Sequence, residues 1–140
     1  MKFTVRCAVV AALGIAMISF STSGTTTAAN NNAESIKEVM QKVNGKGGIG
    51  GQLKSGVAAK EIKWDEVSKN AKALIPLAKD LAAGKPPKGD DASWKKYTEA
   101  YVKAAEDLDK AATAKDAKAA GDALKVLNNC GGCHGAHKGK

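Results

Sequence analysis

Aromatic residues are scarce in this sequence: its 140 residues include two tryptophans, two tyrosines and two phenylalanines. Its 22 basic residues are interleaved with 14 acidic residues and are not gathered beside aromatic side chains. A surface that binds nucleic acid combines a basic patch with rings that stack on bases, so nucleic acid is not an expected partner. A chain this rich in alanine and lysine also buries little apolar area, and small cores of this kind often need a metal, a disulfide or a cofactor.

Long hydrophobic runs are also missing. The apolar run at residues 7–20 is too short to cross a bilayer as a helix. Lys2 and Arg6 precede this run, and small residues at 25–29 follow it, which is the pattern of a secretory signal. We therefore expect residues 1–29 to be a signal peptide that is removed after export.

The alternative for this segment is a buried N-terminal helix. Residues 21–33, which follow the apolar run, are small and polar and resemble a loop more than a core segment, so we favour the signal peptide. Cleavage near Ala29 would leave a single domain over residues 30–140, located in the periplasm without a stable membrane anchor. Loss of Lys2 and Arg6, with no acidic residue, lowers the formal net charge from +8 to +6.

Apolar residues recur at a spacing of three or four in four segments, as in amphipathic helices. The first stripe is Ile36, Val39, Met40 and Val43. The second stripe is Trp64, Val67, Ala71, Leu74, Ala78 and Leu81. The third stripe is Trp94, Tyr97, Tyr101, Ala105 and Leu108, and the fourth is Ala117, Ala120, Leu124 and Leu127. Mostly short connections join these segments, so we predict an all-α fold, an antiparallel four-helix bundle.

Local signals predict where some of these helices begin and end. Gly84 should end the second helix, and Asp91 or Ser93 should cap the third. Thr113, with Asp116 three residues later, resembles a capping box for the fourth helix. Residues 45–56 include six glycines and interrupt the helical pattern, which predicts either a long loop over a site or a flexible crossover.

Only two cysteines, Cys130 and Cys133, lie beyond the expected signal peptide, and with His134 they spell C-x-x-C-H. This motif is the attachment signature of c-type haem. Two thiols three residues apart can each bond to a haem vinyl group, while the next imidazole reaches the iron from the same side. Extending the apolar stripe beyond Leu124 and Leu127 brings Cys130 and His134 onto the core-facing side of the fourth helix. We therefore expect one covalently attached haem inside the bundle.

Three other uses of the cysteine pair compete with haem. Cys130, Cys133, His134 and His137 offer a Cys₂His₂ zinc set, but four ligands within eight residues could hardly form a tetrahedron without unwinding the chain. A C-x-x-C redox pair of the thioredoxin type opens a helix in an α/β fold, whereas this pair lies at the end of an all-helical chain. A structural disulfide would leave His134 unexplained.

The C-terminal motif resembles that of the cytochrome c′ family, the class II c-type cytochromes, and in particular its methionine-ligated low-spin relatives. In this family C-x-x-C-H is followed by two residues, an aromatic residue and a basic residue. Here "CGGCHGAHK" has Lys138 at the basic position and His137 in place of the aromatic residue. The resemblance implies an exported four-helix bundle with one haem c near its C-terminus, held by Cys130 and Cys133, with His134 as the proximal iron ligand.

The resemblance leaves two functions open. The chain is a one-electron carrier if the iron has a second strong protein ligand, and a five-coordinate protein that binds NO or CO if it has none. We favour the carrier. An enzyme is not expected, because a peroxidase-like reaction needs an acid or base beside the iron and the stripe of the first helix is apolar.

Met40 is the candidate sixth iron ligand. It is the only methionine beyond the expected signal peptide, and it lies on the apolar stripe of the first helix. His137 follows His134 by three residues on the same helical end and so lies on the same side of the ring, and lysine amines begin protonated. The methionine-ligated relatives also take their ligand from the first helix. The alternative is that Met40 fills core space and Val43 faces an open iron.

Redox proteins are the expected partners. The expected mature chain carries +6, and two haem propionates would lower this charge without reversing its sign, so we expect an acidic patch on the partner. The resemblance also allows a homodimer. The sequence departs from the family in the absence of arginine from residues 36–43 and in the glycine-rich segment that follows them.

The motif and the signal together make a prediction about the mass of the exported protein. We expect an intact mass that lacks about the first 29 residues and includes one haem, because the two thiols bond to the ring. Mass spectrometry of protein made in a host that attaches haem c checks this. Haem that is released by acid extraction and leaves both thiols free would contradict it.

Overall fold

The computed structural model describes residues 35–139, and every regular element in that range is a helix. The helices are α1 (Ile36–Asn44), α2 (Ile49–Val57), α3 (Trp64–Ala83), α4 (Asp91–Ala114), α5 (Ala117–Leu127) and α6 (Cys130–His137). The all-α prediction is therefore confirmed, and the arrangement is compatible with a helical bundle. The expected signal peptide, residues 1–29, lies outside the described residues.

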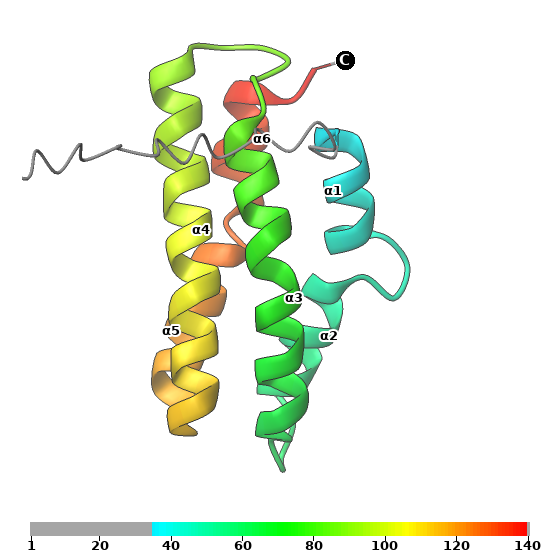
Figure 1. Cartoon of the computed structure of the whole chain (residues 1–140), viewed down its shortest axis with the longest axis vertical. Coiled ribbons are helices and arrows are strands. Elements are labelled where there is room, and N and C mark those ends of the chain that lie inside the picture. The colour runs from blue at the N-terminus through cyan, green and yellow to red at the C-terminus, as the bar shows by residue number, and fades with distance from the viewer. Residues whose placement is uncertain (1–34, 140) are drawn as a thin grey trace, which may run out of the picture.

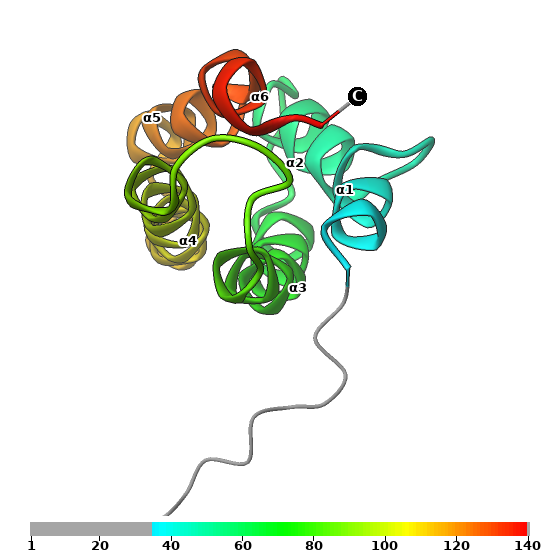
Figure 2. The same cartoon turned by 90° about the horizontal axis from the view of Figure 1, so that it is seen from above.

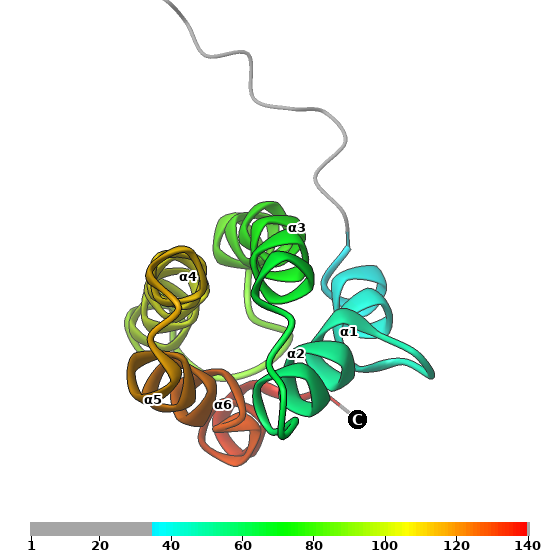
Figure 3. The same cartoon turned by 90° about the horizontal axis from the view of Figure 1, so that it is seen from below.

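The helices stand in columns around a shared core (Figure 1). α3 and α4 are the long columns and lie side by side, whereas α1 stands above α2 and α6 stands above α5. In the lower half, α2, α3, α4 and α5 surround one centre, and each contacts its neighbours (Figure 3). In the upper half, α1 packs against α3 and α6 packs against α4 (Figure 2). None of the helices in residues 35–139 is long and apolar enough to cross a membrane.

The predicted apolar stripes form most of the core. The largest fully buried apolar side chains are Leu53, Leu74, Leu108, Val39, Val43 and Val67. All of these except Leu53 belong to a predicted stripe. Ala117 is exposed, contrary to the prediction, because it is the first residue of α5 and lies at the end of the bundle where α4 passes into α5.

The glycine-rich segment 45–56 is not the loop that the sequence predicted, because most of it belongs to helix α2. Leu53 holds this helix in place: its side chain is 1% exposed and belongs to the core cluster. Burial of one leucine side chain contributes roughly 1.5–3 kcal/mol, which offsets much of the low helix propensity of the glycines.

Two of these glycines allow the tight connection from α1 to α2. Gly47 has a φ of +75°, a conformation that residues with a side chain rarely adopt. A Cβ atom on Gly50 would lie 3.1 Å from the carbonyl oxygen of Val43, so a larger residue would force the start of α2 away from α1. The glycines therefore shape a compact helical connection instead of a flexible crossover.

The connection between α3 and α4 is fixed by a buried tryptophan. Gly84 ends α3, as predicted, and its carbonyl oxygen accepts a hydrogen bond of 2.7 Å from the Trp94 indole N–H. Trp94 is 6% exposed. Asp90 caps α4, instead of the predicted Asp91 or Ser93, because its carboxylate accepts the Ser93 backbone N–H at 2.7 Å. The tryptophan and the cap together set where α4 begins.

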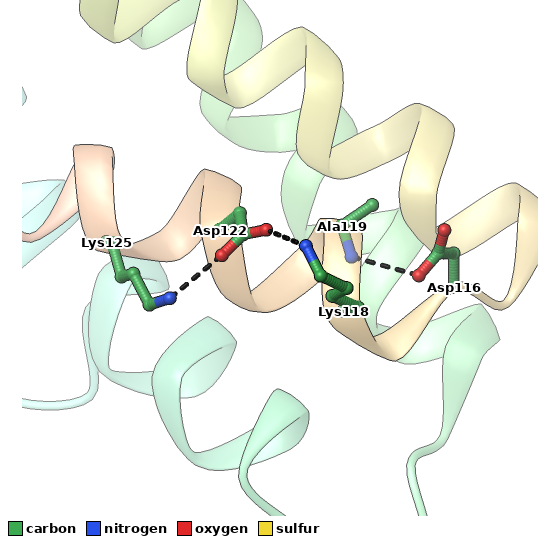
Figure 4. Close-up of polar contacts among 5 residues, drawn as sticks. All are labelled: Asp116, Lys118, Ala119, Asp122 and Lys125. Atoms are coloured by element: carbon green, nitrogen blue, oxygen red, sulfur yellow. Dashed lines mark hydrogen bonds and ion pairs between the residues drawn. The ribbon is translucent and has the colours of Figure 1, made fainter.

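The predicted capping box of α5 is also wrong. Thr113 still belongs to α4, which runs to Ala114, and the chain then turns at Lys115, whose φ is +55°. Asp116 itself is the cap, and its carboxylate accepts the backbone N–H of Ala119 at 2.9 Å (Figure 4). Thr113 and Asp116 therefore lie on opposite sides of the turn and not in one helical start.

Ion pairs cover the exposed face of α5. Asp122 lies between Lys118, at 2.9 Å, and Lys125, at 2.8 Å (Figure 4). The hydrogen bonds from Lys125 and Lys118 lower the pKa of Asp122 to about 2. The same spacing recurs on α4, where Asp107 pairs with a lysine on each side. Such exposed pairs contribute little to stability, so they indicate a solvated surface.

The chain breaks between α5 and α6, which corrects the prediction of one continuous helix. The Leu124 carbonyl accepts both the backbone N–H and the side-chain Nδ2 of Asn128, each at 2.9 Å. Asparagine competes in this way with the helix backbone and favours helix ends. Because α6 begins anew, Cys130 and His134 are exposed instead of facing the core, and Cys133 is half-buried.

Removal of the Trp94 hydrogen bond should destabilise the fold. Trp94→Phe leaves the Gly84 carbonyl without its partner, and we expect a loss of about 1–2 kcal/mol in the free energy of unfolding. Trp64→Phe is the matched control, since Trp64 is only half-buried and loses a similar ring area. Urea unfolding of both variants measures the difference. Equal losses would contradict the role given to this bond.

Candidate functional site

A cavity opens in the upper half of the bundle, where α1, α3, α4, α5 and α6 converge. Its volume is about 210 Å³, and its mouth is open to solvent. The lining residues are Met40, Asn44, Leu81, Lys96, Tyr97, Thr98, Ala100, Tyr101, Val126, Leu127, Asn129, Cys130, Cys133 and His134. Most of the exposed surface of this lining is apolar.

The four site residues that the sequence predicted all line this cavity. Cys130, Cys133 and His134 reach it from α6, and Met40 reaches it from α1. Met40 precedes Cys130 by 90 residues in the chain, so only the fold brings the two together. Both cysteines are free thiols.

Burial affects the ionisable groups beside the cysteines. Burial, and then the nearby Cys130, raises the pKa of the Cys133 thiol, which therefore stays protonated at neutral pH. The same two causes raise the pKa of Tyr101 to about 12. Tyr101 thus presents a neutral phenol to the cavity. Lys96, which also lines the cavity, adds a positive charge.

The close approach of α6 to α4 depends on a glycine inside the C-x-x-C-H motif. A Cβ atom on Gly132 would lie 3.3 Å from the Tyr97 ring, which is tighter than an ordinary contact. A Cβ atom on Gly131 would have nothing within 4 Å. The second x position of the motif therefore faces α4, and the first faces away from any neighbouring side chain.

Met40 is held beside the cavity by its own helix. The Nδ2 group of Asn44 donates a hydrogen bond of 3.7 Å to the Met40 sulfur, and both residues line the cavity. Val43, in contrast, is 2% exposed and packed in the core, and it does not line the cavity. The side of α1 that faces the site therefore offers a thioether and an amide.

His137 does not join the other three residues of the Cys₂His₂ set. Its ring nitrogens lie 3.0 Å from the Ser93 hydroxyl oxygen and 2.9 Å from the Lys88 carbonyl oxygen, so both already have partners. Within residues 35–139, no three His, Cys, Asp or Glu side chains are grouped so that they could hold a metal ion. A zinc site that uses His137 would require at least one of its two hydrogen bonds to break.

The residues around the cavity fit a covalently attached haem. A porphyrin ring needs an apolar space, and the lining is largely apolar. Cys130 and Cys133 supply two free thiols on one helix, and His134 supplies an imidazole next to them. Met40 supplies a soft sulfur donor from a different helix, as expected for an axial ligand of iron. The donor set therefore matches this cofactor better than it matches zinc.

No family model, curated protein or solved structure matches this chain.

Asn44 and Val126 are among the lining residues that were not foreseen from the sequence. Asn44 is four residues after Met40, a spacing that places both on one helix face, so this contact could have been predicted. Val126 lines the cavity and is 47% exposed. Among residues 35–139 it is the one large hydrophobic residue that is exposed. Its position depends on the break after α5 and on the packing of α4, so no local signal identifies it.

The two glycines of the motif should respond differently to alanine. Gly131→Ala should leave stability unchanged or raise it by up to about 1 kcal/mol, because alanine favours the helix. Gly132→Ala gains the same propensity but pushes against Tyr97, so we expect it to be about 1 kcal/mol less stable than Gly131→Ala. Urea unfolding of the two variants provides a matched comparison. Indistinguishable midpoints would show that α6 does not pack closely on α4.

Proposed function

We propose that this chain is an exported monohaem c-type cytochrome that carries single electrons, with the iron between His134 and Met40. The observation that supports this most strongly is that the C-x-x-C-H motif and Met40 line one apolar cavity although they lie at opposite ends of the described chain. The four columns would form the antiparallel bundle expected of such a protein. The haem would be held by Cys130 and Cys133.

A bound haem would supply iron that changes between the ferric and ferrous states. The protein residues have three tasks around it. Cys130 and Cys133 would fix the ring to α6, and His134 would donate an imidazole nitrogen to the iron from the same helix. Met40 would donate its sulfur from α1 on the opposite side. A methionine ligand favours the ferrous state and raises the reduction potential.

The exposed edge of the cavity suits electron exchange with another protein. Val126 and Ala100 line the cavity and are both exposed, so an apolar edge of the site reaches the surface. Lys96 lies on the same lining and adds positive charge there. A redox partner with an acidic patch would therefore approach close to the cofactor, and charge steering would speed the encounter.

Binding of NO or CO is the second candidate function, and the Asn44 contact is the observation that favours it. The Asn44 amide donates its hydrogen bond to the Met40 sulfur, which is the atom that would bind the iron. If this contact held the sulfur turned away from the iron, Met40 would not ligate it, and a coordination site would remain open for a gas. Optical spectra separate the two functions, because six-coordinate His/Met haem is low-spin and five-coordinate haem is high-spin.

Loss of the Met40 sulfur should open the iron. We expect Met40→Ala and Met40→Leu to convert low-spin haem to high-spin haem, lower the reduction potential and allow ferrous haem to bind carbon monoxide. Met40→Leu is the matched control for packing, since leucine keeps most of the side-chain volume and removes only the donor atom. Optical spectra and a potentiometric titration measure these changes. A wild-type ferrous protein that is already high-spin and binds carbon monoxide would replace the carrier with the gas-binding function.

A further inference from the structure

Helix α6 carries Cys130, Cys133 and His134, yet its sequence is a poor helix former. It has eight residues, and three of them are glycine. Glycine has a lower helix propensity than any residue except proline. Asn129 precedes the helix without making a side-chain capping bond. Because helices this short are unstable alone, α6 must be held by its tertiary contacts.

His137, the last residue of α6, makes the most complete set of these contacts. Its side chain is 1% exposed. The Lys88 carbonyl can only accept a hydrogen bond, so the Nδ1–H of His137 donates to it at 2.9 Å. Nε2 then accepts the hydroxyl hydrogen of Ser93 at 3.0 Å. A neutral imidazole with this tautomer satisfies every polar group in the contact.

Two aromatic rings of α4 complete the site of His137. The centroid of the imidazole lies 5.4 Å from that of the Trp94 ring at 75°, and 5.9 Å from that of the Tyr97 ring at 72°. Both are edge-to-face arrangements, which are favourable for aromatic rings. Tyr97 also lines the cavity. One ring therefore contacts both His137 and the site.

The connection between α3 and α4 is shaped to receive this imidazole. It arches over the top of the bundle toward α6 (Figure 2). Gly89 in this connection has a φ of +85°, and a Cβ atom there would lie 2.8 Å from the Nδ1 atom of His137. Any residue other than glycine would therefore displace the imidazole. His137 thus joins three separate parts of the chain: α6, the 84–90 connection and α4.

We propose that His137 is a positioning residue that fixes α6, and with it His134 and the two cysteines, against the cavity. The part of this proposal that concerns the iron rests on the proposed haem function. The docking of α6 does not, because it is a contact within the chain. Through Tyr97, the same contact sets how closely α6 packs on α4 beside the site. Loss of His137 should therefore loosen α6 first and alter the iron environment as a consequence.

The first test measures α6 in the full chain without haem. Hydrogen exchange of residues 130–137 should be about tenfold faster in His137→Phe, which keeps a ring but loses both hydrogen bonds. His137→Gln should exchange more slowly than His137→Phe, because an amide restores a donor and an acceptor. Lys138→Ala, a change at the exposed neighbour, should match the wild type. Wild-type exchange in His137→Phe would overturn the proposal.

The second test measures the iron environment and uses haem-loaded protein. Two thioether bonds keep α6 attached to the ring, so a purely structural role for His137 would leave the reduction potential unchanged. We expect a lower potential and a smaller low-spin fraction in His137→Phe, with partial recovery in His137→Gln. Ser93→Ala removes one hydrogen bond of His137. It should lower the reduction potential and the low-spin fraction as well, but by less than His137→Phe does.

The two tests separate this proposal from the proposed function. If no haem attaches, the haem function fails, and the exchange data still decide whether His137 docks α6. If haem attaches and the potential of His137→Phe equals that of the wild type, the positioning role fails and the haem function stands. Where His137→Phe does not fold, Ser93→Ala and His137→Gln provide the same comparisons.

Discussion

The packing of α3 against α4 is the contact on which the rest of the structure depends. The shorter helices pack on this pair. α1 and α2 contact α3, and α5 and α6 contact α4. The Trp94 indole bonds to Gly84 at the point where α3 passes into α4, so this residue fixes the connection that also receives His137. The position of the cysteine-bearing helix is therefore set at the end of the long helices where α3 passes into α4.

The difference between the two halves of the bundle explains where the cavity lies. In the lower half, α2 and α5 contact each other and close the ring around buried residues such as Leu53 and Leu108. In the upper half, Met40 on α1 and Cys133 on α6 line one cavity together with Tyr101 of α4. A ring bound there would occupy the space that the lower half fills with leucine side chains, and the alanine-rich core would gain the apolar contacts that it lacks.

The sequence alone predicted those parts of the fold and site that depend on the spacing of nearby residues. Helical spacing identified buried residues such as Val39 and Leu74, and the spacing of Cys130, Cys133 and His134 identified the candidate site. The helix α2 was missed because glycine has a low helix propensity, and only burial of Leu53 in the folded chain compensates for it. Likewise, the break before α6 depends on a hydrogen bond from one asparagine side chain, which a periodic pattern does not contain.

The burial of the two histidines is the reverse of what the motif suggests. His134, the expected iron ligand, is exposed at the cavity, whereas His137, which the motif does not require, is almost fully buried. A ligand must keep a ring nitrogen free for the metal, and His137 has both nitrogens bonded to Ser93 and Lys88. A residue that holds a helix in place has the opposite requirement, since an unbonded buried nitrogen would destabilise it. Under the proposed function, His134 would bind the iron, whereas His137 would hold α6 in place.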